Sequence, residues 1–138
     1  MSKLFDTLFS YGFHDTTISN IKVCEHQVKV HFDKGLYSLD KNGKETELTK
    51  PITLVIDIDK EHGLVASQTI AIQRYSNKRF HKGLKRLDIE EIKDSELMNL
   101  VVGNVYYSGF DNAVLIEAFG NGYSYSINIS ECVGFKFE

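Results

Sequence analysis

The sequence predicts a mainly β protein, an antiparallel meander that forms a sandwich or a partly open barrel, with one short N-terminal helix. Three observations support this fold class. Apolar and polar residues alternate over much of the chain. Two Asn-Gly pairs, at 42–43 and 121–122, stand where tight antiparallel turns are needed. Long apolar helical segments, which parallel strands require as connections, are missing from the sequence.

The whole chain, residues 1–138, is expected to form a single domain. Its 42% hydrophobic and 25% charged residues are typical of a globular protein. A chain of this length can bury a core without disulfide bonds or metals. It contains one proline and ten glycines, and no repeat or low-complexity linker marks a boundary within it.

The first expected element is a short amphipathic helix. Leu4, Phe5, Leu8 and Phe9 recur at helical spacing. We expect their apolar stripe to cover one open end of a sheet.

Two hairpins are expected next. The first turns at residues 25–26, and apolar alternation sets two cross-strand pairs that face the core, Val23 with Val28 and Ile21 with Val30. The second turns at residues 42–43 and joins strands 36–40 and 45–49. A strand at 52–59 follows, with four inward residues: Ile52, Leu54, Ile56 and Ile58.

The hairpin that turns at residues 121–122 has a register on which turn chemistry and apolar alternation agree. Three pairs face the core: Ala118 with Tyr125, Ile116 with Ile127, and Val114 with Ile129. The same register sends Leu115 and Phe119 to the opposite face.

Four further strands are expected at 64–75, 85–92, 104–110 and 132–137, with a helical turn near 94–102. The total is then roughly eight to ten strands. Aromatic residues cluster late in the sequence. They can form a pocket or contact patch, but apart from Phe119 we expect them to fill the core: Tyr106, Tyr107, Phe110, Tyr123 and Tyr125.

Charge and cysteine content point to a cytoplasmic protein without a membrane partner. Sixteen basic and nineteen acidic residues give a net charge of -3, so no global field attracts nucleic acid or anionic lipid. No apolar run has the length that spans a bilayer, and the N-terminus lacks a signal-peptide pattern. Cys24 and Cys132 are interpreted as reduced thiols.

Familiar catalytic motifs are missing, and we expect no cofactor and no resident metal. There is no Gly-x-Ser-x-Gly elbow, phosphate-binding glycine loop, His-Glu-x-x-His or Cys-x-x-Cys pattern. One alternative is a small metal-dependent hydrolase that uses His14, Asp15, Asp57 and Asp59, since clustered carboxylates and histidines can hold a metal. The competing interpretation is a turn-forming His-Asp pair and two carboxylates on a solvated strand face.

The most unusual local feature is the segment from residue 74 to residue 86, which contains six basic residues and no acidic one. We take it as the candidate binding segment, through Arg74, Tyr75, Lys78, Arg79, Phe80, Lys82, Lys85 and Arg86. Such a segment can bind an acidic protein, or nucleic acid and phosphorylated ligands. It can also be neutralised by the acidic residues that follow it: Asp88, Glu90, Glu91, Asp94 and Glu96.

Residues 13–35, which read FHDTTISNIKVCEHQVKVHFDKG, resemble the opening of several uncharacterised bacterial families. In those families a His-Asp pair precedes a strand, a tight turn and a second strand that ends near a glycine. Some of them look like immunity proteins, which bind and block a toxin. The resemblance implies an intracellular binding protein without catalysis.

The preferred hypothesis is therefore a non-catalytic intracellular binding or interaction protein. An acidic protein is the expected partner, nucleic acid is not preferred, and self-association is left open. The hydrolase is the alternative, and a binder of nucleic acid or of a phosphorylated ligand through residues 74–86 is the third hypothesis.

Overall fold

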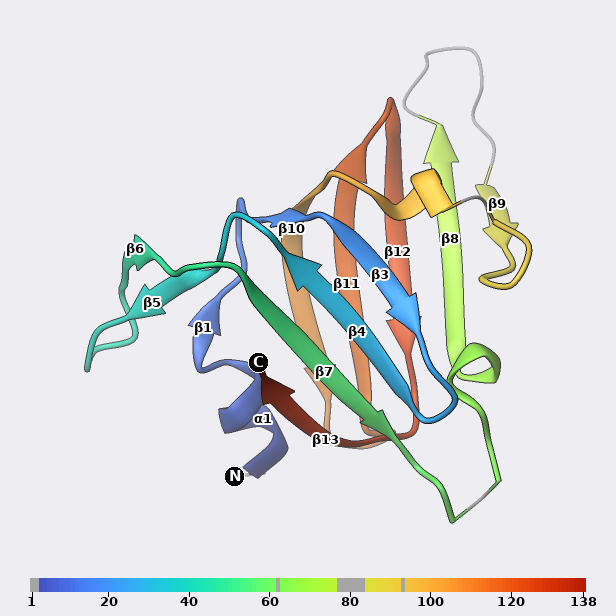
Figure 1. The fold of residues 1–138 in the computed structure, drawn as a ribbon, viewed down its shortest axis with the longest axis horizontal. Helices are drawn as coiled ribbons and strands as arrows, with labels where there is room; N and C mark the ends of the chain where they lie inside the picture. Colours follow the sequence, from blue (N-terminus) through green and yellow to red (C-terminus); the bar gives the residue numbers. More distant parts are fainter. Residues whose placement is uncertain (1–2, 62, 77–83, 93) are drawn as a thin grey trace.

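The computed structural model describes residues 3–61, 63–76, 84–92 and 94–138 and confirms the mainly β, antiparallel prediction (Figure 1). Its described part contains thirteen strands, more than the eight to ten expected. The difference arises partly because two of them have only two residues each, too few to show an alternating pattern. Helix α1 (Lys3–Leu8) contacts strand β13 (Cys132–Phe137), at one edge of the four-stranded sheet.

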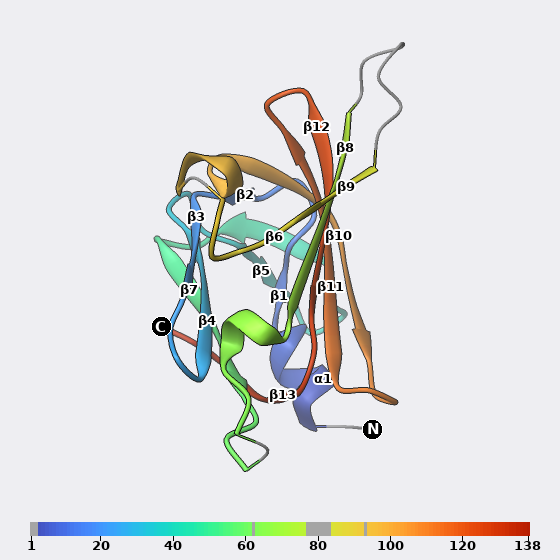
Figure 2. The same ribbon diagram turned by 90° about the vertical axis from the view of Figure 1, so that its right-hand side faces the viewer.

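Two sheets pack face to face as a sandwich, seen edge-on in Figure 2. The six-stranded sheet has the order β2 (Thr17–Ile18), β10 (Leu100–Ser108), β11 (Ala113–Gly120), β12 (Tyr123–Ile129), β8 (Ile70–Ser76) and β9 (Leu84–Leu87). The four-stranded sheet has the order β13 (Cys132–Phe137), β7 (Ile52–Ile58), β4 (Gln27–Phe32) and β3 (Asn20–Val23). Its strands run diagonally across those of the larger sheet (Figure 1).

A third, three-stranded sheet forms an arm at one side of the sandwich (Figure 1). Its order is β1 (Tyr11–Gly12), β5 (Tyr37–Leu39) and β6 (Glu45–Leu48). The expected turn at residues 42–43 joins β5 to β6, and Gly43 takes a φ of 77° there. Only glycine adopts such a value without strain.

Apolar residues on the inner faces of the two main sheets form one core. Its largest fully buried side chains come from both sheets and the segments beside them: Phe32, Leu8, Ile18, Leu36, Leu54, Ile56, Ile58, Ile72, Leu100, Ile116, Ile127 and Ile129. Burial of each such side chain stabilises the fold by about 1.5–3 kcal/mol.

Both hairpin registers read from the sequence are confirmed. Strands β3 and β4 pair Val23 with Val28 and Ile21 with Val30. Strands β11 and β12 show all three expected pairs around the turn at residues 121–122. The inward residues of both hairpins are buried or packed against the core.

Two expected strands are shorter because local hydrogen bonds compete with strand pairing. Residues 66–68 form the 3-10 helix η1 (Ala66–Gln68), and the hydroxyl of Thr69 donates to Ala66 O over 2.8 Å. Strand β8 therefore starts at Ile70, not at residue 64. The strand expected at 85–92 ends at Leu87, because the carboxylate of Asp88 accepts a hydrogen bond from Glu90 N and forms a turn.

The strand expected at 104–110 instead covers Leu100–Ser108, and the helical turn expected at 94–102 is confined to η2 (Asp94–Leu97). A β-bulge between Val102 and Asn104 explains the error. Leu100 and Val102 face inward before the bulge, and Val105 and Tyr107 contribute to the core after it. The extra residue shifts the alternation by one, so the pattern breaks in mid-strand.

Within the described residues, no helix combines the length and apolar character that crossing a membrane requires.

Candidate functional site

The described part of the candidate binding segment lies on β8 and on β9, the strand at the edge of the six-stranded sheet. Lys78, Arg79, Phe80 and Lys82 lie outside the described residues. Tyr75 on β8 and Lys85 and Arg86 on β9 are exposed, as expected. Arg74, in contrast, is largely buried, since its side chain is only 19% exposed.

Arg74 belongs to a small polar cluster at the edge of the core. It forms an ion pair with Glu96 through Nη1 and Oε1, and its guanidinium carbon lies 4.2 Å from the ring centroid of Tyr123. The hydroxyl of Tyr125 donates to the same Glu96 oxygen over 3.2 Å. Burial, together with the charge of Glu96, raises the pKa of Tyr125 to about 12. The expectation of exposure is therefore wrong for Arg74, which has a structural role.

Arg74 and Glu96 form the one ion pair that joins the basic segment to the acidic stretch after it, as far as the described residues show. Lys85 and Arg86 form no ion pair with this acidic stretch among the described residues, so their charges are available to a partner at the surface. The neutralised-surface interpretation holds at Arg74 and does not extend to these two side chains.

His14 and Asp15 stabilise the bulge in β10. Nδ1 of His14 donates to Gly103 O over 2.6 Å, and the backbone amide of Asp15 donates to Val102 O. Nε2 of His14 lies 3.3 Å from an oxygen of Asp15. Both ring nitrogens thus face acceptors. The hydrogen bond to the Gly103 carbonyl raises the pKa of His14, and the negative charge of Asp15 raises it further to a smaller extent. This geometry is that of a turn-forming His-Asp pair.

Asp57 and Asp59 lie at the far end of β7 from that pair. Phe13 packs on Phe32, whose strand partner is Ile52. Asp57 lies five residues further along β7, about 16 Å away at the usual rise of a strand. There Asp57 accepts a hydrogen bond from Gln27. No group of three or more potential metal ligands occurs in the described part of the chain, so the four residues of the hydrolase hypothesis are not brought together.

The outer surface of the six-stranded sheet carries several exposed apolar side chains, and we call it the aromatic face. It carries four large, outward side chains that are about half exposed: Tyr75, Leu84, Tyr106 and Phe119. One row across the strands places Phe119, Ser124, Tyr75 and Leu84 side by side. A parallel row contains Tyr106, Leu115, Asn128 and Ala71.

A polar row lies between these two rows. Its members are Asn104, Glu117, Ser126, Gln73 and Arg86. Next to it, small residues leave a hollow of about 490 Å³, which Tyr106 and Leu115 line together with Ser126 and Asn128. The aromatic face therefore combines apolar anchors with hydrogen-bonding groups.

Sequence reasoning found only part of this face. The register of β11 and β12 correctly sends Leu115 and Phe119 outward. The expectation that Tyr106 and Phe110 fill the core is wrong, because they are 49% and 99% exposed. Tyr106 follows the bulge, which reverses the faces of the strand, and Phe110 lies in the turn between β10 and β11.

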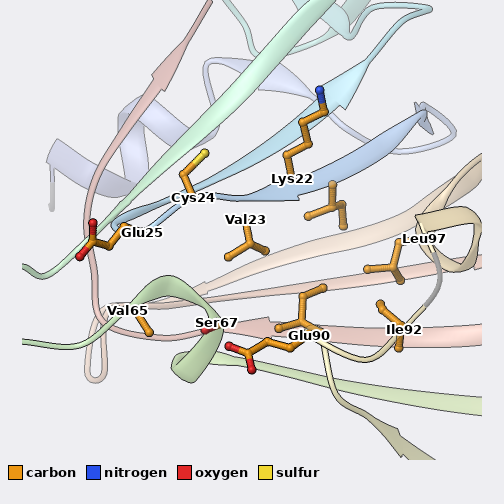
Figure 3. Close-up of a pocket in the computed structure, with 11 residues that line it drawn as sticks. Lys22, Val23, Cys24, Glu25, Val65, Ser67, Glu90, Ile92 and Leu97 are labelled. Atoms are coloured by element: carbon orange, nitrogen blue, oxygen red, sulfur yellow. The ribbon is translucent and has the colours of Figure 1, made fainter.

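A second hollow, which we call the intersheet cavity, opens between β3 and the segment that contains η2 (Figure 3). Its volume is about 690 Å³. Most of its wall is apolar: Ile21, Val23, Val65, Ile89, Ile92 and Leu97. Such a volume lies in the range of pockets that bind small molecules.

Comparisons of the chain with protein-family models, with curated proteins and with solved structures found no match.

Proposed function

We propose that the chain is a non-catalytic binding protein that recognises a protein partner inside the cell through its aromatic face. The observation that carries this proposal is the gathering of Tyr75, Leu84, Tyr106 and Phe119 on one sheet surface. Exposed apolar groups that gather on one surface among polar residues are typical of interaction sites. Tyrosine is also enriched among the residues that contribute most to binding energy.

The size of the face indicates the centre of an interface. Five neighbouring strands span about 19 Å, and the two apolar rows lie about 13 Å apart. The resulting footprint of about 250 Å² is roughly a third of what one partner of a standard interface buries. We expect surrounding residues, including exposed Phe110, to complete the contact.

Charge at the β9 edge favours an acidic protein. Arg86 ends the polar row of the aromatic face, and Lys85, the partner of inward-facing Arg74, is exposed on the other face of the same strand. Glu117, in contrast, lies in the middle of the face, and Asp111 lines its hollow. A phosphate backbone carries charge along its whole length and would be repelled by these carboxylates, whereas an acidic protein can place its own carboxylates at the β9 edge alone, so an acidic protein is favoured over nucleic acid. A toxin of the kind that immunity proteins block belongs to the proposed class of partner.

The experiment compares two double variants. Tyr75→Ser with Phe119→Ser removes apolar anchors from the aromatic face. Leu48→Ser with Val133→Ser removes side chains of similar exposure, 49% and 52%, elsewhere on the surface. A partner is captured from the source cell with the wild-type protein, identified by mass spectrometry and purified, and its affinity for each variant is measured.

We expect the face variant to lose at least about 30-fold in affinity, because each anchor of this kind contributes about 1 kcal/mol or more. The control variant should bind like the wild type. Circular dichroism checks that both variants are folded. Equal affinity of the two double variants would refute the proposal.

A further inference from the structure

The intersheet cavity is bounded by three separate parts of the chain. Strand β3 contributes Ile21 and Val23, the segment before η1 contributes Val65, and the segment between β9 and β10 contributes the rest of the apolar wall. Leu97 is buried, and the other apolar side chains of the wall are only partly buried. Apolar surface of this extent gains free energy when it is removed from water.

Four polar side chains also line the cavity, Lys22, Glu25, Ser67 and Glu90, and the last three lie toward one end of the view in Figure 3. Figure 3 shows Ser67 and Glu90 toward one end of the view, and Ile92 and Leu97 toward the other. Lys22 and Cys24 alternate with the inward residues of β3, and the Lys22 amino group points away from the cavity (Figure 3). The wall is thus apolar at one end and carries a carboxylate at the other.

Glu90 is the charged group best placed to meet a ligand. A hydrogen bond of 2.9 Å from its backbone amide to the Asp88 carboxylate holds it in a turn. No lysine, arginine or histidine in the described part of the chain forms an ion pair with Glu90. The neighbouring carboxylate of Glu25 lies 3.8 Å from His26. The end of the cavity that contains Glu90 is therefore complementary to a positive charge.

We infer that the intersheet cavity binds an amphipathic small molecule that has an apolar body and a positively charged, hydrogen-bond-donating head group. The apolar body lies against Val23, Ile92 and Leu97, and the head group lies at Glu90 and Ser67. The volume of about 690 Å³ accommodates a ligand of this class. This inference is independent of the aromatic face, which lies on the opposite side of the six-stranded sheet.

The test uses three probes with the same ten-carbon chain: decylammonium, decan-1-ol and decanoate, all below their micelle-forming concentrations. Binding to the full chain is followed by amide chemical shifts in NMR spectra. We expect decylammonium to bind about tenfold more tightly than decanoate, with decanol between them, because the Glu90 carboxylate attracts one head group and repels the other. The shifts should map to β3 and residues 89–97.

Two variants locate the site. Glu90→Gln should reduce the preference for decylammonium over decanoate and leave decanol binding unchanged, while the Glu25 carboxylate of the same wall is retained. Ile92→Trp should narrow the cavity and weaken all three probes, whereas Leu48→Trp, on the exposed strand β6, should have no effect. If Ile92→Trp does not fold, the Glu90→Gln variant and the chemical-shift map still show whether the probes bind in the intersheet cavity.

Absence of binding by all three probes, or shifts confined to other surfaces, would overturn the inference. So would equal affinity for decylammonium and decanoate in the wild-type protein. The Tyr75→Ser, Phe119→Ser variant should keep its affinity for decylammonium. The probe measurements therefore test the cavity inference alone, and the partner affinities test the aromatic face alone.

Discussion

The ring of Phe119 lies against Gly103 on the neighbouring strand, where a Cβ built on the glycine would come within 3.2 Å of Phe119 Cε1. Gly103 is the bulge residue whose carbonyl accepts the hydrogen bond from His14. An aromatic ring packed over a strand glycine covers backbone that water would otherwise reach. The same contact fixes the position of one anchor of the aromatic face.

We expect Gly103→Ala to displace the Phe119 ring and to lower the free energy of unfolding by about 1 kcal/mol, since the added methyl group overpacks the contact. Gly109→Ala is the matched control, because its Cβ would meet only Tyr107 at an ordinary 3.9 Å. Urea unfolding measures both. A Gly103→Ala protein as stable as Gly109→Ala would show that the ring adapts without cost.

Ile116→Ala and Ile127→Ala should each lower the free energy of unfolding by about 2–5 kcal/mol, because each leaves a cavity in the core. The two side chains are cross-strand neighbours on the inner face. Leu115→Ala, on the outer face of the same hairpin, should cost less than either. Denaturant melts in which Leu115→Ala is the most harmful of the three would mean that the faces are reversed.

Glu96→Gln should lower the free energy of unfolding by about 1–3 kcal/mol, because it removes the charged acceptor shared by Arg74 and Tyr125. A double-mutant cycle with Arg74→Met isolates the energy of the pair. Glu91→Gln, at an exposed position, is the control and should change stability little. A coupling energy near zero would contradict the structural role assigned to Arg74.

The two cysteines should differ sharply in reactivity. Cys24 is exposed, whereas Cys132 is buried, and burial raises the pKa of its thiol to about 12. At pH 8 a disulfide reagent such as dithionitrobenzoate should therefore modify one thiol rapidly in the folded protein and the second only after unfolding in guanidinium. The Cys24→Ser variant should show no rapid reaction. Rapid modification of two thiols in the native wild-type protein would place Cys132 at the surface.

His14 and His31 should titrate on opposite sides of pH 6.5. The pKa of His14 is raised by Gly103 O and Asp15, whereas burial followed by the charge of Lys22 lowers the pKa of His31. The contribution of His14 to stability is present at low pH and is lost as the pH rises through its folded pKa. The contribution of His31 is present above pH 6.5 and is lost as the pH falls. NMR titration of the ring carbons checks the order, and a lower pKa for His14 than for His31 would contradict it.

The hairpins could be predicted from the sequence because their registers depend on local patterns. Residues 121–122 set the turn between β11 and β12, and the alternation on each side agrees with it. Strand β10 could not be read in the same way, because the bulge at Gly103 breaks its period and is stabilised by His14, 89 positions earlier in the chain. A contact of that separation leaves no local signal.

The candidate sites were harder to predict than the strands. The aromatic face depends on which strands become neighbours, and β8 joins β12 only through the tertiary fold. The intersheet cavity likewise lies between segments far apart in the sequence. Charge density, in contrast, is visible in the sequence, but it does not show that Arg74 points inward to Glu96 while Arg86 stays at the surface.

The pairing of β13 with β7 has a consequence for synthesis of the chain. Strand β7 ends at Ile58, and its partner begins at Cys132, so one edge of β7 stays unpaired while a further stretch of more than half of the sequence is translated. Ribosomes add about 5–20 residues each second, so that edge is open for several seconds. Unpaired strand edges invite association between chains. The nascent protein is therefore expected to depend on chaperones during this interval, although the finished sandwich has the edge of β7 covered.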